Sequence, residues 1–178
     1  MIDAATELLL EAGPRAVTVD AVSDRSGVAK STLYRHWDSR EGLLVDVMRA
    51  NVPDIEPPPD GLDFEQSLRY VVTSVAAMLV SPRWRGILPA LMMLQQHQPE
   101  LAEIAHADHE GKRQILDAAL QQGIADGRLP ADIDEELASR QLIGPVFFAV
   151  LTAHPDDDAA VDRTVEYVLE RFLASYPA

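Results

Sequence analysis

The sequence predicts an all-α fold, with a small N-terminal three-helix head followed by a larger helical body. Apolar side chains recur every three or four positions along most of the 178 residues, which is the period of an amphipathic helix. Nowhere do they show the strict alternation of a half-buried strand. A proline-rich segment at 52–61 cannot be helical, because proline fixes φ and lacks an N–H donor. It separates a predicted domain at 1–51 from a second at 52–178.

The first two helices are bounded by residues that start and stop helices. The first runs from Ile2 to Ala12, where Gly13-Pro14 stops it. The second runs from Val19 to about Ser26. Thr18 is placed to cap its N-terminus, and Gly27 can adopt the left-handed conformation that ends it.

The ten residues after Gly27 predict a third helix with one polar side. Leu33 and Trp37 lie one turn apart and form its apolar edge. The other side carries only hydrogen-bond donors and no carboxylate: Lys30, Ser31, Thr32, Tyr34, Arg35 and His36. Such a face suits the major groove of DNA, and the two helices with their glycine-containing turn have the helix-turn-helix pattern. An ordinary helical hairpin with a solvated outer face fits the geometry equally well.

Helices are expected to fill the rest of the chain. A fourth, from about Arg40 to Asn51, completes the head. The body carries five further amphipathic stretches: Asp63 to Ser81, Trp84 to Leu94, Glu100 to Gly123, a helix capped by Asp134, and Val161 to Leu173. Gly144-Pro145 is expected to kink the fourth of these five.

The charge of the chain narrows the classes of partner. There are 15 Lys and Arg against 29 Asp and Glu, a formal charge of −14. This argues against a nonspecific nucleic-acid binder, which would be basic throughout. A local cationic strip nevertheless runs from Arg25 to Arg40, with Asp38 as its one acid. The chain has no cysteine, and its most apolar run, 142–153, is too short to span a membrane. We expect an intracellular, cytoplasmic protein.

The first quarter of the chain contains five short motifs: Glu11-Ala12-Gly13, Thr18-Val19, Gly27-Val28, the string from Thr32 to Trp37, and the run from Ser39 to Leu44. In this order and register, they resemble the DNA-binding domain of the TetR family of transcriptional repressors. Two features depart from the family: the chain begins without the basic arm that relatives usually carry, and Ala29 stands where many relatives place a capping Ser. The remainder of the chain matches the family only in length, helical pattern and layout.

The resemblance implies a ligand-responsive transcriptional repressor that binds double-stranded DNA at a near-palindromic operator. Recognition helices read bases mainly with their N-terminal residues, so Lys30, Ser31 and Thr32 are the candidates for base edges. Thr18, Tyr34, His36 and Arg40 match the family's phosphate-contacting positions, and Arg35 suits either role. Effector binding would favour a separation of the two heads that no longer fits successive major grooves.

An apolar set in the body is the candidate effector site. It consists of Trp84, Met92, Met93, Phe147 and Phe148. Core packing is the default explanation for such residues. Methionine adapts to irregular shapes and Trp offers an N–H, however, a mixture common in pockets for apolar molecules. The resemblance implies that a small effector binds among these helices.

Other candidate sites have simpler explanations. Glu103, His106, His109 and Glu110 have spacings that suit a metal, but charges at these intervals are more often the solvated side of an amphipathic helix. The run 156–158 is three aspartates without the pattern of a calcium loop, and a solvated turn explains it better. The sequence contains no catalytic signature. We therefore expect no metal site, no cofactor and no enzymatic activity.

The last two long helices are predicted to form a dimer by four-helix packing. Their apolar positions exceed what we expect one chain to cover: Leu142, Val146, Phe147, Val150, Val161, Val165, Val168 and Phe172. A rival hypothesis is a small-molecule-binding or protein-interaction module whose head no longer reads DNA. The acidic total charge and the missing basic arm motivate it.

Overall fold

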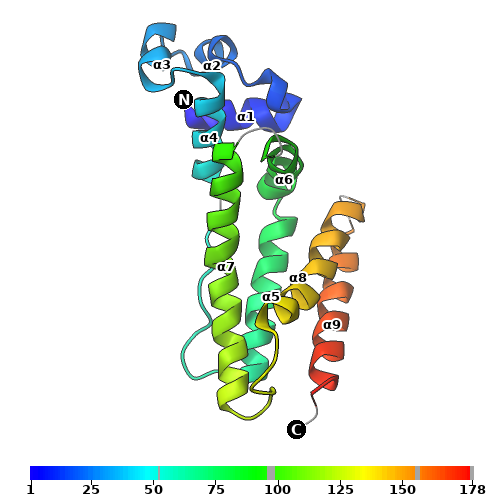
Figure 1. Cartoon of the computed structure of the whole chain (residues 1–178). Helices are drawn as coiled ribbons and strands as arrows, with labels where there is room; N and C mark the ends of the chain where they lie inside the picture. The colour runs from blue at the N-terminus through cyan, green and yellow to red at the C-terminus, as the bar shows by residue number, and fades with distance from the viewer. Residues whose placement is uncertain (52, 96–98, 155–156, 177–178) are drawn as a thin grey trace. The chain divides into compact units, whose positions relative to one another are not determined.

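A computed structural model describes residues 1–51, 53–95, 99–154 and 157–176, apart from ten side chains between positions 91 and 109. Within these ranges the fold is all-α, as predicted, and contains no strand. The described residues form nine α-helices, which are labelled in Figure 1: α1 (Ile2–Ala12), α2 (Val19–Ser26), α3 (Lys30–His36), α4 (Arg40–Asn51), α5 (Phe64–Val80), α6 (Pro82–Gln95), α7 (Pro99–Ala125), α8 (Glu135–Thr152) and α9 (Asp158–Ala174), with a 3-10 turn, η1 (Pro14–Ala16), after α1. None of the described helices is long and apolar enough to cross a membrane.

The chain divides into two compact units. The head unit comprises residues 1–53 and 82–108, and the body unit comprises residues 54–81 and 109–178. The chain therefore leaves the head at Pro53, within the proline-rich segment that we expected to separate two domains. It then returns, because α6 and the first part of α7 belong to the head unit.

The core of the head unit lies where α1, α2, α3 and α4 meet. The largest fully buried side chains of the head unit are Val17, Leu33, Leu43, Leu44 and Met48, together with Ile87 of α6. Burying a side chain of this size contributes about 1.5–3 kcal/mol. The expected caps are present: Thr18 Oγ1 accepts from the Ala21 N–H at 3.1 Å, and Gly27 ends α2 with φ = 69°. The local signals read from the sequence thus set the bounds of α2.

Within the head unit, a polar junction of two buried residues and one exposed arginine attaches α6 to α1 and α4. Asn51, the last residue of α4, donates through Nδ2 to Thr6 Oγ1 at 2.8 Å and to the Val47 carbonyl at 2.6 Å. Its Oδ1 accepts from Arg83 Nε of α6 at 2.5 Å. Asn51 and Thr6 are both buried, and the Thr6 hydroxyl donates to the Ile2 carbonyl. We call Thr6, Asn51 and Arg83 the polar junction; it connects α1, α4 and α6.

The body unit is built on α5, α8 and α9, which pack against one another. α5 begins with a capping box in which the Asp63 carboxylate accepts from the Gln66 N–H and the Gln66 side chain accepts from the Asp63 N–H. Near the end of α7, Gly123 packs against the ring of Phe64. A side-chain carbon at Gly123 would lie 2.6 Å from that ring and 2.9 Å from Leu129 Cδ1. Only glycine fits there without displacing its neighbours.

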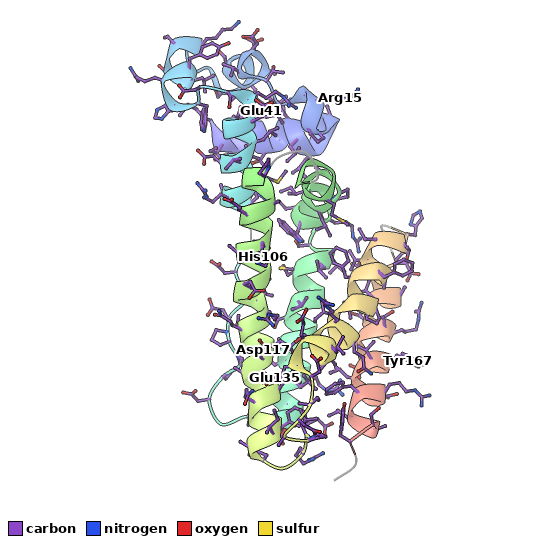
Figure 2. The ribbon with its side chains drawn as sticks, viewed as in Figure 1. Arg15, Glu41, His106, Asp117, Glu135 and Tyr167 are labelled. Atoms are coloured by element: carbon purple, nitrogen blue, oxygen red, sulfur yellow. The ribbon has the colours of Figure 1, made fainter. Side chains whose placement is uncertain are left out.

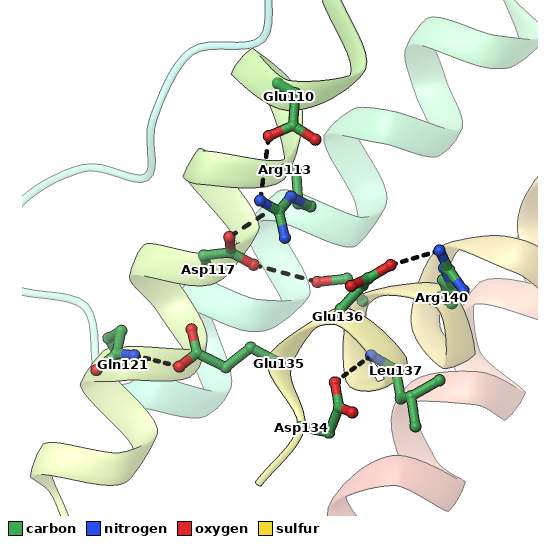
Figure 3. Close-up of polar contacts among 10 residues, drawn as sticks. Glu110, Arg113, Asp117, Gln121, Asp134, Glu135, Glu136, Leu137 and Arg140 are labelled. Carbon is green, nitrogen blue, oxygen red and sulfur yellow. Dashed lines mark hydrogen bonds and ion pairs between the residues drawn. The ribbon is translucent and has the colours of Figure 1, made fainter. Parts of the chain in front are cut away.

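Polar contacts connect α7 to α8 in the body unit (Figure 3). Ser139 donates to Asp117 Oδ1 at 3.3 Å, and the Gln121 amide donates to the Glu135 carboxylate. Arg113 Nε lies 3.9 Å from the other oxygen of Asp117. The helices α5 and α9 also share a polar contact, because Arg69 Nη1 donates to both carboxylate oxygens of Glu166 at 2.7 Å.

The predicted dimer residues require a correction. Seven of them are buried within their own chain: Leu142, Val146, Val150, Val161, Val165, Val168 and Phe172. Phe147 is half-buried. These side chains form the core between α5, α8 and α9, so they are not the exposed surplus from which the dimer was predicted. One chain is able to cover them because α5 packs against both α8 and α9.

The exposed apolar side chains of α8 and α9 are different ones. Leu137, Phe148 and Leu151 expose 59%, 66% and 41% of their surface on α8, and Tyr167 exposes 59% on α9. Figure 2 shows Tyr167 projecting outward from its helix. Eleven residues are close to three helical turns, so Leu137 and Phe148 share one face of α8. We call these four residues the exposed apolar face. Pro145, where we expected a kink, lies inside α8, and the helix continues on both sides of it.

Candidate nucleic-acid interface

α3 is fixed to the head by its apolar edge. Leu33 is fully buried and Trp37 nearly so, and Trp37 Nε1 donates to Asp46 Oδ2 of α4 at 2.8 Å. The indole N–H therefore has a partner, as a buried donor requires. The opposite side of α3 is consequently held outward by packing and not by its own polar groups.

That outer side carries the predicted donors. Five of the six are exposed, namely Lys30, Ser31, Tyr34, Arg35 and His36, while Thr32 is half-buried. Tyr34 exposes 56% of its surface, and the His36 ring lies 5.7 Å from that of Trp37. The structure thus places all six predicted residues on one short helix.

Thr18 and Arg40 have structural partners that sequence reasoning missed in part. Thr18 is the cap of α2, as predicted. Arg40 donates through Nε to the Val17 carbonyl at 2.8 Å and through Nη2 to the Pro14 carbonyl. Its guanidinium therefore connects the start of α4 to η1 and to Val17, the residue that follows η1. These contacts join residues more than 20 positions apart, so no local sequence pattern reveals them.

A cleft of about 260 Å³ lies beside α3. It brings together three of the predicted phosphate-contacting residues, Thr18, Tyr34 and Arg40, with Asp20 and Ser39 also in its wall. His36, the fourth, is not part of this wall. The cleft offers hydroxyl and guanidinium donors next to the N-terminus of α2, whose backbone dipole favours an anion. The carboxylates of Asp20 and Asp38 line the same cleft and oppose an anion there.

The cations near this surface are paired with carboxylates of the same head unit. Lys30 Nζ lies 2.8 Å from Asp20 Oδ1, and Arg25 Nη2 donates to Glu11 Oε2 at 2.6 Å. The hydrogen bond from Lys30 to Asp20 raises the pKa of Lys30, with smaller contributions from the charges of Asp20 and Asp24. In contrast, Arg35 makes no ion pair within residues 1–51, all of which are described. Which carboxylate each cation meets depends on how the helices cross, and sequence spacing did not predict it.

The predicted effector residues are distributed over the two units. Trp84 is buried and Met92 half-buried in the head unit, while Phe147 is half-buried and Phe148 exposed in the body unit. The side chain of Met93 lies outside the described residues. A second cleft in the head unit, of about 570 Å³, has other walls: Asp3, Thr6, Glu7, Leu10, Pro82, Arg83 and Gly86.

The candidate metal ligands show no cluster in the part of the chain that is described. Glu103 and His106 are exposed on α7, and Glu110 accepts a hydrogen bond from Arg113 at 3.1 Å. No three His, Cys, Asp or Glu side chains among the described residues are placed to share an ion. The side chain of His109 and residue Asp156 lie outside that part.

Comparison with known proteins matches both parts of the chain to bacterial transcriptional regulators. Residues 1–47 match the model for the bacterial regulatory proteins of the tetR family, and residues 58–168 match the model for the tetracyclin repressor-like C-terminal domain. The HTH-type transcriptional regulator YdeS of Bacillus subtilis is 30% identical over 152 residues, covering 85% of this chain and 76% of that protein. The HTH-type transcriptional repressor KstR2 of Rhodococcus jostii is 28% identical, covering 97% of this chain and 87% of that protein.

Solved structures share the fold. A TetR transcriptional regulator from Agrobacterium tumefaciens aligns with a TM-score of 0.77 at 18% identity, covering 99% of this chain and 92% of the other. The regulator FadR of Bacillus subtilis, in complex with stearoyl-CoA, aligns with a TM-score of 0.73 at 22% identity, covering 97% and 96%. The resemblance in the N-terminal motifs is thereby confirmed and extends to the body. This chain belongs to the TetR family of transcriptional regulators.

Proposed function

We propose that this regulator is a repressor that binds a near-palindromic DNA operator and leaves it when a small apolar effector binds. The observation that carries the proposal is the geometry of α3, whose apolar edge is buried while its other side presents donors to solvent. A helix held in this way can enter the major groove without losing its own packing. We assign Lys30, Ser31 and Thr32 to base edges and Arg35 to either bases or phosphates.

The cleft beside α3 supports the assignment of phosphate contacts. Thr18, Tyr34 and Arg40 lie in its wall, and we assign them to the DNA backbone together with His36. Arg40 already holds two carbonyl groups, so replacing it would disturb the head itself. Tyr34 is the better probe, because its hydroxyl is exposed and its removal leaves the helix intact.

The experiment selects bound duplexes from a random pool with the purified protein. Enrichment of an inverted repeat would support the regulator, and no enrichment would favour a module whose head does not read DNA. Thr32→Ala should then change which base is preferred at one operator position, with a loss of about 1–3 kcal/mol of binding free energy there. Tyr34→Phe should weaken binding to all DNA sequences about equally. If Tyr34→Phe changed the base preference instead, the assignment of roles would be wrong.

Relatives named for fatty acids support an apolar effector. The FadR structure from Bacillus subtilis contains stearoyl-CoA, and the Bacillus subtilis fatty acid metabolism regulator is 25% identical over 157 residues. We propose that an effector with an acyl chain or similar apolar part binds among the helices of the head unit, with Trp84 and Met92 of α6 as candidate contacts. A compound present at a hundredfold excess over its Kd should stabilise the protein by about 2.7 kcal/mol. An apolar library without any thermal shift would contradict the proposal.

We further propose that the exposed apolar face is covered by a second copy of the chain. Leu137, Phe148 and Leu151 on α8, with Tyr167 on α9, would meet their symmetry equivalents in a four-helix arrangement. A two-fold dimer would place two α3 helices one turn of DNA apart, about 34–36 Å, as a palindrome requires. The family relationship supports the same pair of helices.

A further inference from the structure

Asp20 and Lys30 join the two helices of the DNA-binding motif by an exposed ion pair. Asp20 lies in the first turn of α2, Lys30 is the first residue of α3, and their charged atoms are 2.8 Å apart. Both side chains are more than half exposed, at 66% and 52%. Exposed ion pairs of this kind contribute little to stability. The fold therefore does not explain why the pair is present.

The position of Lys30 gives the pair a meaning for DNA recognition. It occupies the first turn of α3, from which recognition helices read base edges. An unpaired lysine at such a place binds any phosphate within reach, and each neutralised phosphate adds affinity that carries no sequence information. The Asp20 carboxylate both neutralises Lys30 and repels phosphate. It therefore opposes the sequence-independent part of binding.

The same pair leaves base readout intact. An ammonium group has three donors, so Lys30 can donate one hydrogen bond to Asp20 and another to the O6 or N7 of a guanine. A base edge is a neutral acceptor, and its attraction to a donor does not require net charge on the protein. A paired Lys30 therefore favours guanine over phosphate, whereas a free lysine would bind both.

The charge balance of the head agrees with this function. Residues 1–51 contain six basic and eight acidic residues, so the DNA-binding part of the chain is itself slightly acidic. Arg25 is paired with Glu11, and Arg40 is held by backbone carbonyls. Arg35 is the cation of α3 without an ion pair in this fully described segment, and it is thus the one free to bind phosphate from that helix.

We propose that Asp20 is a specificity-determining residue of the DNA-binding surface. Its carboxylate and the Lys30 ammonium form a pair with no net charge, in which Lys30 still has N–H donors free. The pair thereby directs Lys30 to a guanine edge and suppresses its binding to phosphate. The inference rests on the proposed function, because it requires that α3 reads an operator. It assigns to Asp20 a role in DNA binding that is indirect, acting through Lys30.

The test uses the full chain and four variants: Asp20→Asn, Lys30→Gln, the double variant, and Asp3→Asn as a control. Asp20→Asn keeps the size of the side chain and removes its charge. Asp3→Asn removes the same charge from α1. Binding is measured on the selected operator and on a scrambled duplex of equal length, between about 50 and 200 mM salt. Thermal melting verifies that each variant is folded.

Asp20→Asn should bind scrambled DNA about fivefold more tightly and steepen its salt slope by about 0.9 per subunit, the value for one additional phosphate contact. Operator affinity should change less than twofold to threefold, so the ratio of specific to nonspecific binding falls. In the Lys30→Gln background the same substitution should have almost no effect, and Asp3→Asn should leave the salt slope unchanged.

Three results would overturn the inference. One is that Asp20→Asn increases the affinity for scrambled DNA equally with and without Lys30, which would indicate a general effect of charge. Another is a gain of the same size from Asp3→Asn. The third is an unchanged ratio of operator to scrambled binding. If the wild-type protein selects no sequence at all, the proposed function fails together with the inference; if it selects an operator but Asp20→Asn behaves like wild type, only the inference fails.

Discussion

Truncating Asn51 tests whether the polar junction stabilises the head unit. Asn51→Ala removes the two bonds that Nδ2 donates, to Thr6 and Val47, and the one that Oδ1 accepts from Arg83. A typical net contribution is about 0.5–1.5 kcal/mol for each bond. The Thr6 hydroxyl keeps its bond to the Ile2 carbonyl, and the exposed Arg83 can turn to water, so no buried group is left without a partner. We expect a loss of about 2–3 kcal/mol.

The measurement is urea unfolding at one fixed protein concentration, because a dimer would make stability depend on concentration. Hydrogen exchange adds a local readout, and its protection should fall first in α1 and α4. Gln121→Ala is the matched control. It also truncates an amide with a side-chain partner, but Gln121 is exposed and Glu135 only half-buried, so it should cost less than about 0.5 kcal/mol. Equal losses from Asn51→Ala and Gln121→Ala would refute the reasoning.

Three other substitutions test the body unit, the apolar face and the head's charge pairs. Phe148→Glu should leave helix content unchanged and give a monomer in sedimentation, because the ring is 66% exposed within its own chain; a dimer of wild-type affinity would contradict the proposed interface. Gly123→Ala should cost about 1–3 kcal/mol in thermal unfolding, because its new methyl group would lie 2.6 Å from the Phe64 ring; an unchanged melting temperature would show that the ring moves without cost. The hydrogen bond from Arg25 lowers the pKa of Glu11 below its ordinary 4.5. The stability that this pair contributes is present above pH 4.5 and is lost as the pH falls through the lowered pKa. Glu11→Gln should therefore remove part of the acid dependence of the melting temperature. A variant with the same pH profile as the wild type would speak against this.

Local signals predicted the helices of the head well. The bounds expected for α1, α2 and α4 agree with the structure, because breakers and caps such as Thr18 and Gly27 act through their own backbone and immediate neighbours. The same applies to the polar side of α3, which follows from a period of 3.6 residues and one buried edge. Family motifs in this region then supplied the function that geometry alone left open.

Tertiary partners could not be predicted in the same way. The apolar stripe that includes Val165 and Phe172 was visible in the sequence, but periodicity does not tell whether a stripe is covered by the same chain or by another. The sequence predicts Phe148 as a pocket residue, but its ring is 66% exposed on α8. The partners of Lys30 and Arg40 depend on how helices cross, which no spacing along one helix encodes.

The acidity of the head has a consequence for how many copies of the regulator a cell needs. A genome offers about 10⁶–10⁹ competing nonspecific sites for each operator. A basic head would spend most of its time on these sites, and the operator would be occupied only when many molecules were present. A head with eight acidic and six basic residues should bind each of these sites less tightly. Under the proposed function, fewer copies of the regulator would then be needed to keep one operator occupied.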